Sequence, residues 1–214
     1  INLSATSTLN DASLAVTSGI AKAEAAATID VQSSQLRTTE NFTAQATTTV
    51  NTSTFTTPIA ASVQRVDARA TVNVGGSSTL TVAGDAQLGA TTSVSTNATP
   101  TSALANKAGD AAVAVSDVTS VAQVRVTGTT TATVTGKLGL AAANTVSTTS
   151  IADAAAAGGN AAGAAVAVSV IDSTTSAVVD GQAVITAGAL DLAAASRNTA
   201  IVTAKAASQG AEKD

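Results

Sequence analysis

Cysteine, histidine, methionine, tryptophan and tyrosine are absent from this chain of 214 residues, and phenylalanine occurs only twice, at Phe42 and Phe55. Without histidine and cysteine, the sequence lacks both the base of a catalytic triad and the usual ligands of a zinc site. Without large aromatic side chains, the sequence has few residues that can fill the centre of a rounded globular core. We therefore expect no enzyme, no cofactor and no metal site.

Charge is also scarce, because only 11 % of the residues are charged and the net charge is −4. An acidic balance gives no electrostatic attraction to nucleic acid or to an anionic membrane surface. No stretch approaches the roughly 20 apolar residues of a membrane span. We expect neither a nucleic-acid partner nor membrane insertion. Because the sequence opens on Ile1 rather than Met, we expect a segment of, or a product processed from, a longer chain.

The sequence does contain an internal repeat. The phrase Ala-Val-Ala-Val-Ser at 112–116 returns at 165–169, which is 53 positions later. Equivalent valines mark four units, at spacings of 43, 52 and 53: Val31, Val74, Val126 and Val179. Such a period is typical of an array in which each unit buries its apolar face by stacking on the next.

We divide the chain into one elongated array of four approximate modules, 12–58, 59–110, 111–163 and 164–214. The first module is shorter, which predicts a lost loop or strand segment. In the last module, Ile185 aligns with Val134 at an offset of 51, whereas Leu190 aligns with Leu138 at 52. A one-residue slip reverses which side chains face inward, so we expect a β-bulge or a tighter turn there.

The fold class expected from this pattern is all-β. Thr and Val favour pleated surfaces, and period-2 alternation such as Val124-Arg125-Val126 is frequent. The Ala-rich stretches 21–27 and 153–157 are short, and we favour strand over helix for them. Six expected strands per roughly 52 residues predict two three-strand coils of a parallel β-helix (β-solenoid) per repeat, hence about eight coils in a rod about 40 Å long. The alternative is a row of tandem β-sandwich repeats.

Stacked coils require columns of inward-facing apolar side chains. We predict Val113 and Val115, then Val166 and Val168, to point inward. The remaining predicted core columns contain Val74, Val126, Val179, Leu138, Leu140, Leu190 and Leu192.

Few residues suggest a catalytic or ligand-binding site. Positions 65, 67 and 69 share one strand face, so Arg65, Asp67 and Arg69 form an ion-pair stripe on the surface, which is a weak candidate for a polysaccharide-cleaving site. Thr129, Thr131, Thr133 and Thr135 also share a face and suggest an ice-binding surface, although the equivalent rows of the neighbouring modules are ragged.

The residue pattern of the last module resembles the repeats of giant bacterial exported proteins. Three segments carry this pattern: Ala165–Ser173, Ala177–Gly181 and Thr186–Ala193. These exported proteins are the filamentous-hemagglutinin-like and leukotoxin-like filamentous adhesins. The resemblance covers most of residues 60–207 and, more faintly, 12–59. It implies a right-handed parallel β-helix that forms a stalk or filament at the cell surface or outside a bacterium, with adhesion or scaffolding as its role. As partners we expect further copies of the chain, joined end to end or laterally into a fibre, and we consider a host or matrix glycan.

The chain differs from that family because it has few aromatic residues and lacks asparagine ladders. A sheath, a surface layer or another extracellular fibre therefore stays an alternative. The expected function is thus a structural or adhesive protein of an extracellular bacterial filament, sheath or adhesin stalk. The alternative is a β-solenoid module whose surface binds glycan or ice. Fold alone does not decide between them.

Overall fold

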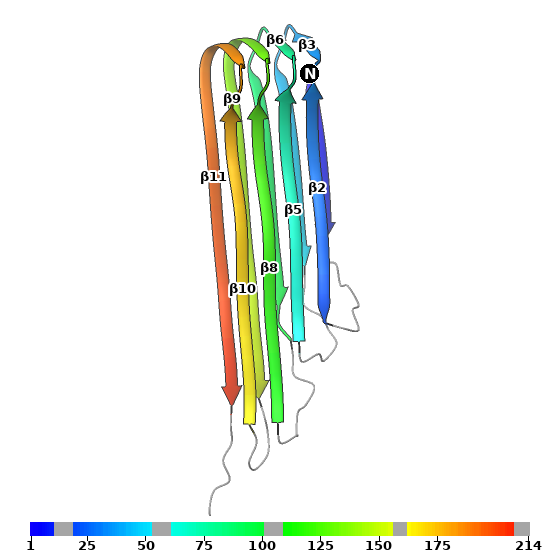
Figure 1. Ribbon diagram of the computed structural model, residues 1–214, viewed down its shortest axis with the longest axis vertical. Coiled ribbons are helices and arrows are strands. Elements are labelled where there is room, and N and C mark those ends of the chain that lie inside the picture. Colours follow the sequence, from blue (N-terminus) through cyan, green and yellow to red (C-terminus); the bar gives the residue numbers. More distant parts are fainter. Residues whose placement is uncertain (11–18, 53–60, 101–108, 156–161, 208–214) are drawn as a thin grey trace, which may run out of the picture.

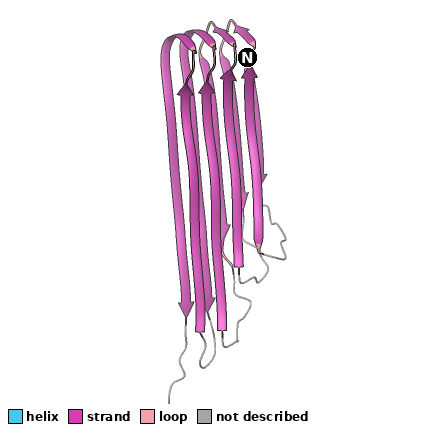
Figure 2. Ribbon diagram, in the orientation of Figure 1, coloured by secondary structure: helices cyan, strands magenta, loops and turns pink. Residues whose placement is uncertain are grey.

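In the computed structural model, the described residues, 1–10, 19–52, 61–100, 109–155 and 162–207, form strands joined by short turns and contain no helix (Figures 1 and 2). An all-β fold was expected, and the Ala-rich stretches 21–27 and 153–155 lie in strands as predicted. The strands are β1 (Asn2–Asn10), β2 (Ile20–Gln32), β3 (Gln35–Thr38), β4 (Phe42–Thr52), β5 (Ala61–Gly75), β6 (Thr79–Val82), β7 (Ala86–Ala98), β8 (Gly109–Val126), β9 (Thr131–Ala155), β10 (Ala162–Val179) and β11 (Val184–Ala207).

The strands make two parallel sheets that face each other. One sheet has four strands in the order β10-β8-β5-β2, and the other has seven, in which β9 pairs with β7, β6 and β11. Figure 1 shows the four-stranded sheet running up one side and the chain bending at the top, where β3 and β6 lie, before it runs down the other side. The seven-stranded sheet follows this bend and is strongly curled.

Each repeat contributes a single layer to this arrangement. Val31, Val74, Val126 and Val179 are paired in register, so the pairing offsets of 43, 52 and 53 equal the repeat lengths. The prediction of two three-strand coils per repeat, and of about eight coils in all, is therefore wrong. The strands expected to be separate are fused, because the Ser and Thr residues between them, such as those at 173–176 in β10, remain extended.

Tandem sandwiches are also wrong, since every strand pair among the described residues joins neighbouring repeats in parallel. The shorter first module was predicted correctly. Almost all of its shortfall lies at the ends of the strands away from the bend: Thr52 pairs with Thr96 at an offset of 44, whereas Ala61 pairs with Val113 at 52. The four module boundaries themselves stay a prediction, and several fall outside the described residues.

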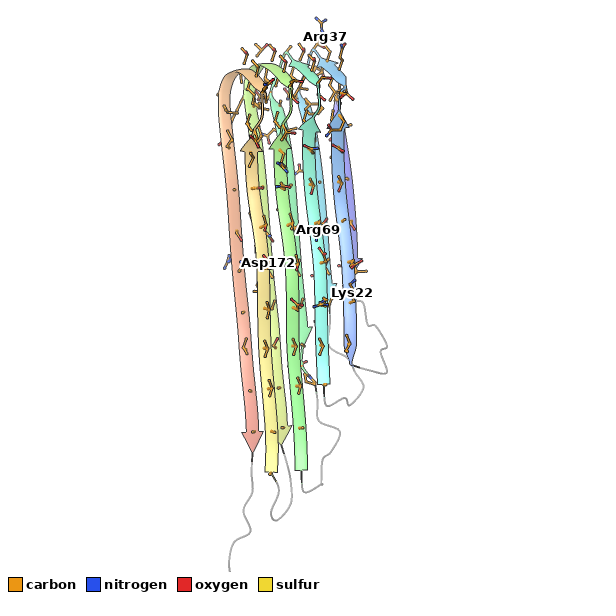
Figure 3. All side chains as sticks on the ribbon, in the orientation of Figure 1. Lys22, Arg37, Arg69 and Asp172 are labelled. Atoms are coloured by element: carbon orange, nitrogen blue, oxygen red, sulfur yellow. The ribbon has the colours of Figure 1, made fainter. Side chains whose placement is uncertain are left out.

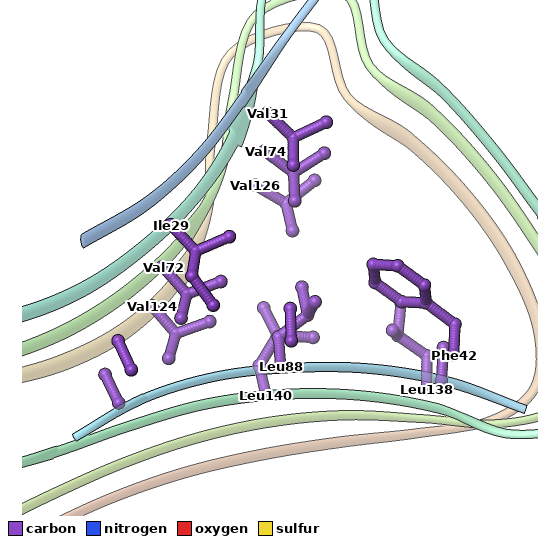
Figure 4. Close-up of a cluster of buried hydrophobic side chains, with 14 of the residues drawn as sticks. Ile29, Val31, Phe42, Val72, Val74, Leu88, Val124, Val126, Leu138 and Leu140 are labelled. Carbon is purple, nitrogen blue, oxygen red and sulfur yellow. The ribbon is translucent and has the colours of Figure 1, made fainter. Parts of the chain in front are cut away.

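The core is widest beside the bend, where large apolar side chains stack in columns (Figure 4). Val74 and Val126 are each only 2 % exposed, and Leu138 and Leu140 are buried. These four residues lie in the core as the sequence predicts. Phe42, Ala86 and Leu138 form a column in which an alanine separates two larger side chains.

The prediction fails for the Ala-Val-Ala-Val-Ser phrase, whose alternation has the opposite orientation. Ala112 and Ala114 are fully buried, whereas Val113 and Val115 face outward and their register partners Val166 and Val168 are exposed. The buried alanines pack against Ala98, Ala152 and Ala154 of the facing sheet. Alanines on both sides bring the sheets close together here, and the valines are left to pack side by side on the outer surface.

In the last layer, the predicted core residues face inward but are not fully buried. Leu190 and Leu192 pair in register with buried Leu138 and Leu140, but they are 51 % and 44 % exposed because no described residue covers this face of the last layer. Val179 is partly buried in the same layer. Their inward orientation thus agrees with the predicted columns, while their burial does not.

Between the bend and the alanine cluster, the interior is partly polar. Asn144 is 1 % exposed; its amide donates to the Ser120 carbonyl at 3.0 Å and to the Ser173 hydroxyl at 3.0 Å, and it accepts from the Ser120 hydroxyl at 2.8 Å. Gln64 accepts from the Thr52 hydroxyl at 2.7 Å. These bonds join the two sheets, and they satisfy polar groups whose burial is otherwise unfavourable.

Glycines shape the bend. Gly76, Gly128 and Gly181 each have a positive φ, near 70°, and they lie one above another in successive layers. The predicted slip in the last module is confirmed as a register shift between Ala187 and Ala189, although Ile185 pairs with Ala132 rather than with Val134.

Candidate functional site

The stripe singled out in the sequence lies on the outer face of the four-stranded sheet. Arg65, Asp67 and Arg69 all point away from the core, and Figure 3 shows the labelled Lys22, Arg69 and Asp172 along this sheet. The two arginine side chains are 66 % and 53 % exposed. The structure thus agrees with the predicted shared face.

The three charges are engaged in ion pairs. Arg69 donates to both oxygens of Asp67 at 2.9 Å, and Arg65 donates to Asp117 of the next repeat at 2.9 Å. The hydrogen bond from Arg69 to Asp67, together with the attraction of that charge, raises the pKa of the guanidinium above its ordinary value. Lys22 pairs with Glu24 on β2 in the same way. Exposed pairs of this kind hold neighbouring side chains in place but contribute little stability.

The stripe of Arg65, Asp67 and Arg69 is poorly arranged for cleaving a polysaccharide. Asp67, the central carboxylate, is held by two nitrogens of one guanidinium, and glycoside cleavage requires a pair of carboxyl groups placed on either side of a bond. Among the described residues, no three acidic side chains lie close enough together to hold a metal ion. The described residues also include no helix that is long and apolar enough to cross a membrane.

Acidic and amide side chains at the turns bond to the backbone. Asn41 accepts from the backbone N–H of Asp85 at 2.9 Å, and Asp85 in turn accepts from the N–H of Lys137 at 2.8 Å. Residues 41, 85 and 137 occupy the same corner in successive layers. Each of the two acceptors therefore fastens its own layer to the next, which is a structural task.

Apolar side chains lie beside the charged stripe. Ile20, Val63, Val115 and Val168 form one column across all four strands, at positions that face outward. A shallow hollow beside this column is lined by Ile20, Lys22, Val63, Arg65, Val115 and Asp117. This surface was not predicted from the sequence, because the valines of the Ala-Val-Ala-Val-Ser phrase were expected to lie in the core.

The threonine row suggested by the sequence lies beside the bend. Thr131, Thr133 and Thr135 are exposed on β9, and Thr129 lies in the turn, where its hydroxyl donates to the carbonyl of Gly76 at 3.2 Å. In the last layer, Val184 occupies the place of Thr131. The row is as ragged as the sequence indicates, so it offers no continuous hydroxyl surface.

A more regular hydroxyl surface covers the outer face of the seven-stranded sheet, along β1, β4, β7 and β9. Thr6, Thr47 and Thr91 are aligned in register, and the adjacent column contains Thr8, Thr49, Ser93 and Thr145. These columns were not predicted from the sequence. They join strands at three different offsets, 41 between β1 and β4, 44 between β4 and β7, and 52 between β7 and β9. Comparisons with protein-family models, with curated proteins and with solved structures found no match for this chain.

Proposed function

We propose that the chain is a β-solenoid segment of an extracellular bacterial filament, sheath or adhesin stalk, with a structural and adhesive role. The observation that supports this most directly is the pairing of every repeat with the next in continuous register, as seen at Val31, Val74, Val126 and Val179. An array held by nearest-neighbour contacts has no inherent limit to its length.

The chemistry of the surface supports a structural role rather than an enzymatic one. On the four-stranded sheet, Lys22 pairs with Glu24, Arg65 with Asp117 and Arg69 with Asp67. At the corner, Asn41 and Asp85 fasten one layer to the next. An enzyme needs unpaired groups that converge on a substrate. The Arg65–Asp117 pair and the bonds accepted by Asn41 and Asp85 instead join one layer to the next.

Lateral association is favoured by the outer column of Ile20, Val63, Val115 and Val168. Ile20 is 57 % exposed and Val168 is 40 % exposed, and the column crosses the whole four-stranded sheet. Contiguous apolar surface of this kind marks protein contacts. A second copy of the chain offers the same flat, apolar column, so two copies can bury it face to face.

Fibre diffraction and electron microscopy of the concentrated protein test the filament. Filaments of stacked layers give a reflection along the fibre axis at about 4.8 Å, the spacing between strands. Val115→Lys should weaken lateral bundling, whereas Thr119→Lys, on the outer face of the same strand, should leave it unchanged. Compact monomers at all concentrations, with no rods in the images, would contradict the proposal.

The extracellular location needs a separate test, because it depends on the resemblance to exported adhesins. Antibodies raised against the purified protein should label intact source cells, and brief protease treatment of those cells should remove the label. Label that appears only after the cells are broken open would place the protein elsewhere and contradict the adhesin role.

A further inference from the structure

The outer face of the seven-stranded sheet presents a grid of small polar side chains. The two columns described above are flanked by a third, in which Asn10, Asn51, Ser95 and Ser147 are in register. Every second residue of β1, β4 and β7 faces outward in this region, and so does every second residue of the matching part of β9. The grid is therefore periodic in two directions, along the strands and across them.

The grid is electrically neutral and its hydroxyls are unused. None of its three columns contains a charged residue from β1 to β9, and the first charge, Arg197, appears on β11 beside Thr145. Within the described residues, the hydroxyls of Thr47, Thr49 and Thr91 make no hydrogen bond to the protein. On the other sheet, by contrast, Arg65 and Arg69 and their partners satisfy each other. In the third column, the Asn51 amide donates to Asn10 at 2.8 Å, whereas the threonine hydroxyls of the first two columns are free to bond to a ligand.

The backbone holds the grid rigidly. Neighbouring strands lie about 4.8 Å apart, and alternate residues of one strand lie about 6.7 Å apart. Threonine is branched at Cβ, so its hydroxyl and methyl group have few orientations. On the inner side of β4, Ala46, Thr48 and Val50 are fully buried, which anchors the strand that carries Thr47 and Thr49.

A ligand that matches this grid in both directions must itself be periodic in two dimensions. A single polysaccharide chain repeats in only one direction, so it would use one column and leave the others empty. A mineral face presents ions, which a neutral grid does not attract. Sugar rings also bind well to aromatic faces, and no aromatic side chain is exposed among the described residues.

We propose that this face binds the surface of ice. A crystal face of ice is neutral, periodic in two dimensions and built of water molecules, each of which donates and accepts hydrogen bonds as a threonine hydroxyl does. The site consists of Thr47, Thr49, Thr91, Ser93 and Thr145, extended by Thr6 and Thr8 on β1. Ice binding at this face goes beyond the structural role and does not depend on it, because the face for lateral association lies on the other sheet.

The purified chain is tested by slow freezing, in which a binder enters the growing ice and other proteins remain in the liquid. The unmodified chain should be enriched in the ice relative to an inert protein of similar size, and it should slow the recrystallisation of fine-grained ice. Thr47→Tyr combined with Thr49→Tyr should abolish both effects, because two large rings lift the ice from the grid. The matched control is Thr71→Tyr combined with Thr119→Tyr, on the outer face of the four-stranded sheet, which should retain both effects.

Circular dichroism of each variant shows whether it folds. Thr47→Val combined with Thr49→Val keeps the shape of the grid and removes two hydroxyls, so it supplies a second, gentler test and should reduce the enrichment. The proposal is overturned if the unmodified chain stays in the liquid, or if the control pair loses as much activity as the grid pair. It is equally overturned if the chain binds crystalline cellulose and not ice, because the ligand is then a packed neutral polysaccharide.

Discussion

Gly128 lies so close to Gly76 of the preceding layer that a Cβ atom on Gly128 would stand 2.5 Å from the Gly76 carbonyl oxygen. Gly128 also has a φ of 73°, which side chains disfavour. The two constraints act together at one point of the bend, where each layer passes from one sheet to the other. Any side chain at Gly128 must therefore displace the backbone of its neighbour.

Gly128→Ala is expected to destabilise the protein by about 2 kcal/mol or more, because it adds backbone strain to a steric clash. Urea unfolding followed by circular dichroism measures the change. Gly139→Ala is the control, since the new methyl group would make only ordinary contacts, with the end of the Gln87 side chain at 3.5 Å and the Ala86 carbonyl oxygen at 3.9 Å. Equal stability of the two variants would show that the bend tolerates a side chain.

Asn144→Ala should lower the free energy of unfolding by about 1–3 kcal/mol, because it removes bonds that join the two sheets and leaves buried polar groups without a partner. Ser147→Ala, on the outer face of the same strand, should change stability by less than about 0.5 kcal/mol. Thermal denaturation of both variants tests the difference. A stable Asn144 variant would mean that the hydroxyls of Ser120 and Ser173 find other partners.

Ala112→Leu tests the orientation of the Ala-Val-Ala-Val-Ser phrase. Ala112 is fully buried, so a leucine overfills the narrow space between the sheets and should cost about 1–3 kcal/mol. Val113→Thr should be nearly neutral, because Val113 faces outward. The opposite result, with a tolerant position 112 and a sensitive position 113, would restore the orientation expected from the sequence.

Phe42→Ala is expected to cost about 3–5 kcal/mol, the usual effect of removing a buried ring. Phe42 is 1 % exposed and lies in the column of Ala86 and Leu138, whose side chains are too short to fill the space that it leaves. Phe42→Leu should cost clearly less. Calorimetric unfolding of the two variants gives the comparison, and equal losses would mean that the ring packs poorly.

Arg65→Ala and Asp117→Ala, made singly and together, measure the ion pair that links β5 and β8. Both side chains are partly in solvent, so their coupling energy should be about 0–1 kcal/mol and should shrink as salt is added. A coupling that is large and unaffected by salt would assign the stripe a greater structural role than its exposure indicates.

The sequence predicts the repeat well because register is a matter of spacing. Val31, Val74, Val126 and Val179 were aligned from spacing alone, and they are paired in the structure. The slip before Leu190 was likewise visible as a change of offset. Both inferences use the order of residues along the chain, which the sequence contains in full.

The orientation and length of the strands were harder to predict. Alternation shows that Ala112 and Val113 face opposite sides, but it does not show which side is the core, and the preference for valine inside proved misleading. The fused strands were missed because Ser173 and its polar neighbours resemble a break in sequence, although the Ser173 hydroxyl is bonded to Asn144 inside the protein. Side-chain partners across two sheets decide both questions.

The single layer per repeat also determines how the protein carries tension. About 50 residues add only about 4.8 Å along the stacking direction, so each unit of length contains a large amount of chain. Between the last two layers, β10 is paired with β8 from Ala162 to Val179, and β11 with β9 from Val184 to Ala207. A pull along the stack is shared by the hydrogen bonds along these paired strands. The tensile strength of the array therefore grows with the width of the layer.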